Sequence, residues 1–403
     1  VNLLDTDGQG LRLQAAADGT TGAASDFTAF ITGEGNLTFT GSGATILLGN
    51  SELGATKNDY QGITYVIDGA NVQFQADSAM GNTKELNLAQ GTKVDLAGFD
   101  QTVLALTGTG SLIVDDGAEF RLNSGSTDQI NVGVNLIGNA QSKGTFIVES
   151  KGANVNFTSS SPYEGNVQLI NTNATLSGNT ATVLSTSDLA LSGTSGLHLS
   201  GVGAQLGSLS QLSGTNSSSI VFDNFVLGQT QLTLDKVSGH YIIDLPNSSD
   251  FSIADTVLLI EADGSGKSDL VIAGDASDAT FGLNDGGNLT GVDYKQNGTV
   301  VAKTDWTLSL ANPTQSGLGL GYNLTKVDIQ SEKNLRIDTS DNATAGEDLT
   351  LSAQIVGQGG ITFAADSDQT IIIGNSANEY YGATTVESGQ LELGAFRGLG
   401  NTS

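Results

Sequence analysis

The amino-acid sequence predicts an all-β protein in which short strands stack as the turns of a solenoid. A unit of roughly fifty residues occurs more than once along the chain, which is typical of repeat architectures. Within each unit, apolar and polar residues alternate in short runs separated by glycines, as in strands with one buried face. One unit alone has too little apolar surface to fold, so copies must stack to bury a continuous interior.

The two clearest copies of the unit begin at Tyr60 and Tyr380. Their matching pairs are Tyr60 and Tyr380, Gly62 and Gly382, Thr64 and Thr384, Val66 and Val386, and Gly69 and Gly389. The match extends upstream, where residues 31–39 align with 355–363 and residues 46–50 with 371–375. A weaker third copy begins at Tyr163 and keeps Gly165, Val167 and Leu169.

The later copy shows how a unit is built. Thr384 and Val386, then Leu391 and Leu393, alternate with polar residues, and Gly389 lies between these two strands, where a tight turn often needs positive φ. Four tyrosines fall at the same repeat position, and we expect packing over a turn to explain them. They are Tyr60, Tyr163, Tyr380 and Tyr381.

The repeat has a recognisable family pattern. The string Tyr-x-Gly-x-Thr-x-Val-x-x-Gly-x-Leu-x-Leu-Gly at 380–394, followed by Gly-Leu-Gly-Asn-Thr at 398–402, resembles the passenger-associated transport repeat of bacterial autotransporters. These are type V secreted proteins, and the resemblance implies a right-handed parallel β-helix with hairpin extensions. It also implies attachment to the Gram-negative outer membrane, with a signal peptide before this segment and a membrane β-barrel after it.

We expect three regions along the chain. Residues 1–234 are predicted as rungs with transport-type repeats, residues 235–310 as β-helix with extruded hairpins, and residues 311–403 as rungs ending in a transport-type repeat. The middle region differs because its apolar runs are longer, as at 257–260 and 306–310, and polar loops separate them.

Composition limits the classes of partner. The 403 residues include 54 Gly, 3 Pro and no Cys, and the formal net charge is −28 from 43 acidic and 15 basic residues. Such acidity disfavours nucleic acid and anionic lipid as partners, because both require clustered Lys and Arg. Absence of Cys excludes disulfides and thiol chemistry. No apolar run approaches the roughly twenty residues that span a bilayer, so we expect no direct membrane insertion of this segment.

Two motifs suggest chemistry but lack the residues that it needs. Gly-Ser-Gly-Lys-Ser at 264–268 resembles the end of a phosphate-binding loop, yet Glu261 stands where that pattern requires Gly, so we interpret the stretch as a hairpin loop. His198 and His240 lack the spacing of a zinc site or a catalytic triad. We expect both to face solvent or to make ordinary hydrogen bonds.

Carboxylates supply the alternative of a polysaccharide-processing enzyme, since β-helix enzymes of that kind gather acidic residues from adjacent rungs. The clusters are Asp115, Asp116 and Glu119; Asp275 and Asp278; Glu347 and Asp348; and Asp366 and Asp368. Arg121 is the basic residue near them in sequence. We interpret the clusters as solvated turn residues. The sequence contains neither the calcium-binding loop Asp-x-Asp/Asn-x-Asp/Asn-Gly nor a Gly-Gly-x-Gly-x-Asp array.

By its resemblance to the adhesins of this family, the chain is expected to be a non-enzymatic surface adhesin. It would mediate cell aggregation and biofilm formation by self-association, or attach to a host matrix protein or glycan. The sequence identifies no catalytic residue, metal ligand or cofactor, and no particular binding residue. A passive structural stalk is the further alternative, because the fold alone does not determine function.

Overall fold

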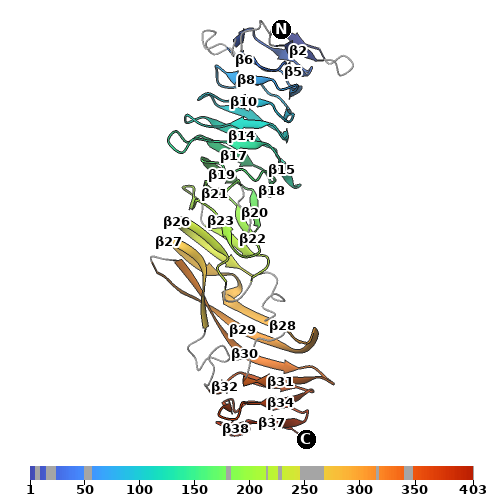
Figure 1. The fold of residues 1–403 in the computed structure, drawn as a ribbon, viewed down its shortest axis with the longest axis vertical. Helices are drawn as coiled ribbons and strands as arrows, with labels where there is room; N and C mark the ends of the chain where they lie inside the picture. The colour runs from blue at the N-terminus through green and yellow to red at the C-terminus, as the bar shows by residue number, and fades with distance from the viewer. Residues whose placement is uncertain are drawn as a thin grey trace. The chain divides into compact units, whose positions relative to one another are not determined.

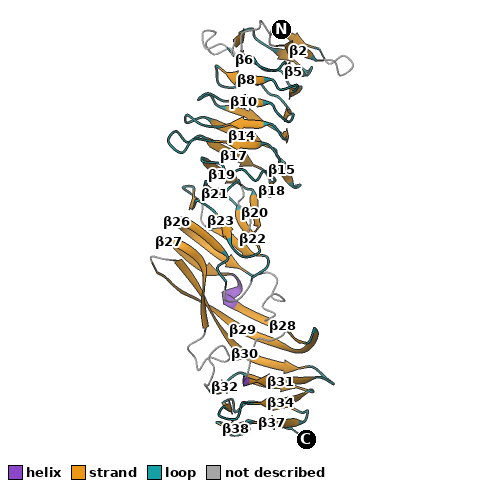
Figure 2. Ribbon diagram, viewed as in Figure 1, coloured by secondary structure: helices purple, strands orange, loops and turns teal. Residues whose placement is uncertain are grey.

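The computed structural model describes all residues except 5–9, 15–23, 50–56, 178–182, 215–216, 226–228, 246–266, 315–316, 340–347 and 403, and only the backbone of 267–269 and 312–314. The described part consists of β-strands and turns with a short 3₁₀ turn, η3 (Asn284–Gly287), and contains no α-helix (Figure 2). Accordingly, none of its helical segments has the length and apolar character needed to cross a membrane.

The chain forms two compact units. The first comprises Val1–Ile220 with Leu232–Tyr241 and Asp278–Thr280, and the second comprises Val221–Gln231, Ile242–Ser277 and Phe281–Ser403.

The first unit begins with parallel strands stacked in columns, so that each turn of the chain adds one strand to each column (Figure 1). One column contains β2 (Leu11–Gln14), β5 (Leu37–Thr40), β7 (Ile63–Val66), β9 (Glu85–Leu88) and β12 (Leu106–Gly108). A second contains β3 (Ala24–Phe27), β6 (Thr45–Leu48), β8 (Asn71–Phe74), β10 (Lys93–Asp95), β13 (Ser111–Ile113) and β16 (Asn135–Ile137). The short strands β1 (Asn2–Leu3) and β4 (Thr32–Gly33) also pair in parallel.

Strand register places residues of the same kind above one another. In the second column Ile46 pairs with Val72, Val72 with Val94, and Val94 with Leu112, and each of these side chains is at most 3% exposed. Residues on either side of them point outward and are mostly polar. The period-two pattern of the sequence therefore becomes a continuous apolar interior with a polar exterior.

Later rungs of the first unit continue the pattern. One column contains β11 (Gln101–Val103), β14 (Glu119–Asn123), β17 (Thr145–Glu149), β19 (Asn166–Ile170), β21 (Asp188–Ser192) and β24 (Ser208–Gln211). Another contains β15 (Ile130–Val132), β18 (Asn154–Phe157), β20 (Asn173–Ser177) and β22 (Gly196–Ser200). Three further strands follow, β23 (Ala204–Gln205), β25 (Ser218–Phe222) and β26 (Leu232–Asp244), and this unit contains β25 up to Ile220 and β26 up to Tyr241. Phe120 and Phe146 stack in the interior with ring centroids 5.7 Å apart.

The second unit contains long antiparallel strands. They are β27 (Lys267–Leu283), apart from its residues Asp278–Thr280, β28 (Asn288–Gln296), β29 (Thr299–Thr314) and β30 (Gly317–Ile329). β28 and β29 form a hairpin through Asn297 and Gly298, whose φ angles of 50° and 72° suit a two-residue turn. β29 pairs antiparallel with β30, and β30 with β27. The predicted hairpins are thus present, whereas the apolar run at 257–260 lies outside the described residues.

Parallel rungs follow the hairpins within the second unit. β33 (Gln354–Gly357) pairs in parallel with β30 and with β36 (Glu379–Tyr380). Two more columns contain β31 (Asn334–Asp338), β34 (Gly360–Ala364) and β37 (Thr384–Ser388), and β32 (Leu349–Leu351), β35 (Thr370–Ile373) and β38 (Gln390–Leu393). The structure confirms the predicted all-β parallel β-helix with hairpin extensions.

Candidate binding surfaces

A band of uncharged polar side chains covers the outward side of β15, β18, β20 and β22 in the first unit. We call this band the polar face. Its members are Asn131, Asn154, Asn156, Asn173, Thr175 and His198. The alternate residues of the same strands point inward, and Val155, Ala174 and Leu197 are fully buried.

Strand register forms the polar face. Asn131 pairs with Asn156, Asn154 with Asn173, and Thr175 with His198 on neighbouring strands. The amide of Asn154 donates to the hydroxyl of Thr175 at 2.9 Å. Amides and hydroxyls each combine donor and acceptor capacity, so a repeated array of them can exchange hydrogen bonds with another such surface.

The neighbouring column carries charged side chains, and we call its outward side the charged face. It comprises Glu119, Arg121, Thr145, Glu149, Asn166, Gln168, Asp188 and Ser208. Arg121 bonds Glu149 at 2.8 Å, Lys143 forms an ion pair with Asp188, and Ser208 donates to Asp188 at 2.6 Å. Burial alone would raise the pKa of Asp188, but the bonds from Lys143 and Ser208 lower it overall. The charges of Arg121, Glu149, Lys143 and Asp188 are therefore paired within the chain itself.

The predicted carboxylate clusters do not form a shared site in the described part of the chain. No three His, Cys, Asp or Glu residues come close enough there to hold a metal ion. Asp275 accepts from the backbone and hydroxyl of Ser277, and Asp278 pairs with Lys236 at 2.5 Å. Asp348 accepts from the backbone of Thr370 at 2.7 Å. Asp366 and Asp368 are exposed, and Glu347 lies outside the described residues.

Asp115 and Asp116 lie at a turn of the first unit, and Glu119 begins the strand β14 that follows it. Asp115 is partly buried, whereas Asp116 and Glu119 are exposed. Burial and the nearby charges of Asp116 and Asp95 raise the pKa of Asp115. Arg121, which the sequence placed beside this cluster, instead bonds Glu149.

Both histidines lie on strands, as the sequence predicts. His198 lies on the outward side of β22, and the Nδ1 atom of His240 is 2.8 Å from the hydroxyl of Thr280. Gln211 also bonds the backbone of His240, accepting from its N–H at 2.7 Å and donating to its carbonyl at 2.6 Å. Of the motif at 264–268, only the backbone of Lys267 and Ser268 is described, within β27.

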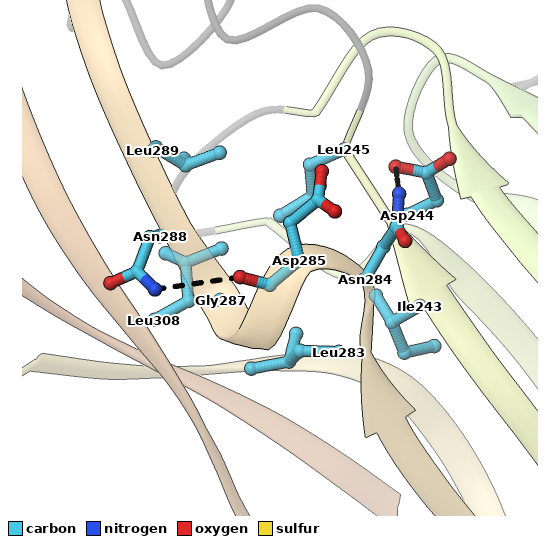
Figure 3. A pocket seen from close by; sticks show the side chains of 10 residues that line it. All are labelled: Ile243, Asp244, Leu245, Leu283, Asn284, Asp285, Gly287, Asn288, Leu289 and Leu308. Carbon is cyan, nitrogen blue, oxygen red and sulfur yellow. Dashed lines mark hydrogen bonds between the residues drawn. The ribbon is translucent and has the colours of Figure 1, made fainter.

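A small pocket lies in the second unit between the end of β26, the turn η3 and β29 (Figure 3). Its volume is about 40 Å³. The lining residues are Ile243, Asp244, Leu245, Leu283, Asn284, Asp285, Gly287, Asn288, Leu289 and Leu308. The pocket was not predicted from the sequence, although Asn284-Asp285-Gly286-Gly287 directly after a strand is a local signal of the tight turn beside it.

A second, wider hollow lies on the outer surface of the first unit. It has a volume of about 380 Å³ and no charged lining residue. Leu47, Gln73, Phe74, Gln75, Ala97 and Phe99 line it. Its chemistry, two amides beside an aromatic ring, is compatible with a neutral sugar, one of the ligand classes expected from the sequence.

Comparison with known proteins finds partial relatives only. A stretch of 124 residues is 40% identical to "Uncharacterized protein YuaQ" of Escherichia coli K12, covering 30% of this chain and 8% of that protein. A stretch of 177 residues is 37% identical to "Uncharacterized lipoprotein YdeK" of the same strain, covering 43% of this chain and 12% of that protein. The matched parts are thus small fractions of both relatives. No family model and no solved structure matches the chain.

Proposed function

We propose that this chain is an adhesive segment of a bacterial cell-surface protein, and that its polar face makes the contact. The observation that carries the proposal is the absence of charge on that face in a chain whose formal net charge is −28. Two acidic molecules repel each other unless their contact surfaces are locally neutral. A neutral array of amides and hydroxyls is therefore the part of the described surface best suited to self-association.

Two further observations support the surface location. The repeat at 380–402 resembles that of autotransporter passengers. One partial relative carries the word lipoprotein in its name, which supports a place in the cell envelope. Attachment to host matrix protein or glycan is the other form that adhesion would take, and the two forms differ in their response to salt.

A settling assay tests the proposal. The full-length protein is displayed on a non-clumping bacterium, and the cells are mixed with differently labelled cells that lack it. We expect only displaying cells to settle together, with weak dependence on ionic strength, because neutral hydrogen bonds are screened little by salt. If displaying cells stay dispersed, self-association is wrong for this protein, and immobilised matrix proteins and glycans become the ligands to test.

Two matched triple variants locate the contact. Asn154→Asp, Asn156→Asp and Thr175→Glu add three negative charges to the polar face. Thr145→Glu, Asn166→Asp and Gln168→Glu add the same charge to the charged face. We expect the first set to abolish settling and the second to preserve it. Equal loss in both sets would mean that net charge, rather than the polar face, controls association.

A length-matched replacement distinguishes adhesion from a passive stalk. The segment is exchanged for an unrelated solenoid of equal length in the displayed protein. Adhesion by this segment predicts that settling is lost after the exchange. Unchanged settling would assign the segment the role of a spacer.

A further inference from the structure

We infer that the hairpin of β28 and β29 is a cap on the edge of β31, held there by Gln296, and that it stops a strand of a second copy from adding to that edge. The inference goes beyond the proposed function, because the polar face lies in the first unit, whereas the hairpin and β31 both lie in the second. It assigns to the hairpin the role of keeping copies apart at one defined strand.

β31 is an outer strand of its sheet. In the described part of the chain it pairs with β34 on one side and with no strand on the other, because the strand order of the sheet is β31–β34–β37. By contrast, a strand in the middle of a column, such as β17, pairs with a strand on each side. An outer strand with free backbone N–H and C=O groups is a template for pairing with another chain.

Gln296 occupies the open side of β31. Its side-chain Oε1 accepts from the backbone N–H of Arg336 at 2.9 Å, and its Nε2 donates to the backbone carbonyl of Arg336 at 2.6 Å. A primary amide offers the same kinds of donor and acceptor as a peptide group, so these two bonds replace those that a neighbouring strand would make to Arg336. While Gln296 is in place, no further strand can pair with this residue.

The hairpin presents Gln296 from an ordered platform. Gln296 is the last residue of β28, directly before the turn at 297–298, and β29 also contacts β31. Val292 and Tyr294 of β28 are buried, at 2% and 5% exposed, so packing anchors the hairpin independently of its contact with β31. Because the platform is already ordered, little conformational entropy is lost when Gln296 bonds the edge.

The same arrangement occurs in the first unit, where another strand ladder stops. The parallel pairing of β24 with β26 ends at Leu209 and Val237. Beyond that point, Gln211 accepts from the backbone N–H of His240 at 2.7 Å and donates to its carbonyl at 2.6 Å. In both units a glutamine amide therefore bonds both backbone groups of one strand residue that lacks a strand partner on that side.

Hydrogen–deuterium exchange tests whether Gln296 closes the edge. The whole chain is compared with Gln296→Ala, which removes both bonds to Arg336, and with Gln358→Ala, which removes the same side chain from an exposed position in the same unit. We expect exchange of the Arg336 amide to become at least about tenfold faster in Gln296→Ala and to stay unchanged in Gln358→Ala. Unchanged exchange in Gln296→Ala would overturn the inference.

Dynamic light scattering at increasing protein concentration tests whether the closed edge keeps copies apart. The parent chain, Gln296→Ala and Gln358→Ala all carry the three polar-face substitutions given above, so association through that face does not contribute. We expect Gln296→Ala to form larger species at concentrations where the other two chains do not, because a second copy is the only source of an added strand in this solution. Circular dichroism and thermal unfolding confirm that each variant is folded.

The size measurement decides the inference independently of the proposed function, because all three chains share the same polar face. If Gln296→Ala forms no larger species than the other two chains, the hairpin does not prevent strand addition, and the inference is wrong even where the Arg336 amide exchanges faster. Failure of the settling assay, in contrast, would leave the comparison of these three chains unaffected.

Discussion

The phenol of Tyr60 lies 2.6 Å from the hydroxyl of Thr64, and both side chains are buried in the interior of the first unit. The hydroxyl of Thr64 lies 2.9 Å from that of Thr83, which donates to the carbonyl of Gly62 at 2.7 Å. Three hydroxyl groups thereby satisfy one another where no water is needed. Buried polar groups of this kind are stable only when each has a partner.

The same chain of hydroxyls recurs in the second unit. Tyr380 lies 2.7 Å from Thr384, Thr384 donates to Thr402 at 2.9 Å, and Thr402 donates to the carbonyl of Gly382 at 2.8 Å. The paired residues of the two sequence repeats therefore make equivalent contacts. The prediction that Tyr381 shares the position of these tyrosines is wrong, because Tyr381 is 51% exposed and neighbouring strand residues face opposite ways.

Thr64→Val should destabilise the fold, because it keeps the volume of the side chain but removes the partner of the Tyr60 phenol. Leaving a buried hydroxyl without its partner costs about 1–3 kcal/mol. Urea unfolding at neutral pH measures the loss. The double variant Tyr60→Phe with Thr64→Val should recover part of it, since both polar groups are then gone. A double variant as unstable as the sum of the two single variants would contradict this explanation.

The third repeat shows why its sequence match is weaker. Val167 stands where Thr64 stands in the first copy, so the phenol of Tyr163 has no hydroxyl at that position. It donates instead to the carbonyls of Val114 and Gly144, at 3.0 and 3.1 Å. The tyrosine keeps its buried place while its hydrogen-bond partners change. The third repeat therefore keeps a buried, hydrogen-bonded tyrosine although its sequence matches the other copies less well.

Gly382→Ala should destabilise the second unit, because a Cβ atom there would lie 2.2 Å from the backbone carbonyl of Gly359 in the stacked rung. Backbone cannot move aside cheaply, so we expect a loss of about 3 kcal/mol, near the upper end of overpacking costs. Gly374→Ala is the matched control, since its Cβ would lie at an ordinary 3.5 Å from the nearest atom. Comparable unfolding midpoints for the two variants would show that close rung stacking at Gly382 is unimportant.

Strands and repeats were predictable because their signals are local. Alternation of apolar residues identifies a strand, and Gly or Asn identifies the turn beside it. The polar face was not predictable, because it depends on which residues stack across rungs of unequal length. Asn131 pairs with Asn156, 25 positions later, and Asn154 with Asn173, 19 positions later. The pocket was harder still, since it requires Asp244 to meet Asn284 beside a left-handed turn.

Asp188→Asn should lower stability at neutral pH, with little effect in acid. Although burial raises the pKa of Asp188, the bonds from Lys143 and Ser208 outweigh it, so the folded pKa lies below the unfolded value. The stabilisation is therefore fully present above the unfolded pKa and is lost as pH falls through the folded pKa. Because Lys143 and Asp188 are both partly exposed, we expect the free energy of unfolding to fall by only about 0.5 kcal/mol at pH 7. Urea unfolding at pH 7 and below pH 3 measures this, and equal loss at both pH values would contradict it.

Asp115→Asn should have the opposite pH dependence. Burial, followed by the charges of Asp116 and Asp95, raises the pKa of Asp115 in the folded chain. A folded pKa above the unfolded value means that wild-type stability falls as pH rises through the interval between them. Asp115→Asn has no carboxyl group to ionise, so its free energy of unfolding should exceed that of wild type at pH 7. Below the unfolded pKa of Asp115 this difference should disappear.

The comparison of these two variants is a strong test, because both remove one carboxylate from the first unit. Unfolding midpoints in low salt at pH 7 should move in opposite directions, down for Asp188→Asn and up for Asp115→Asn. Their difference should shrink in high salt, since the ion pair and the repulsion are both screened. A shift in the same direction for both would mean that net charge, rather than the local surroundings of each carboxylate, determines stability. Opposite shifts would identify Asp115 as a carboxylate that destabilises the folded chain at neutral pH.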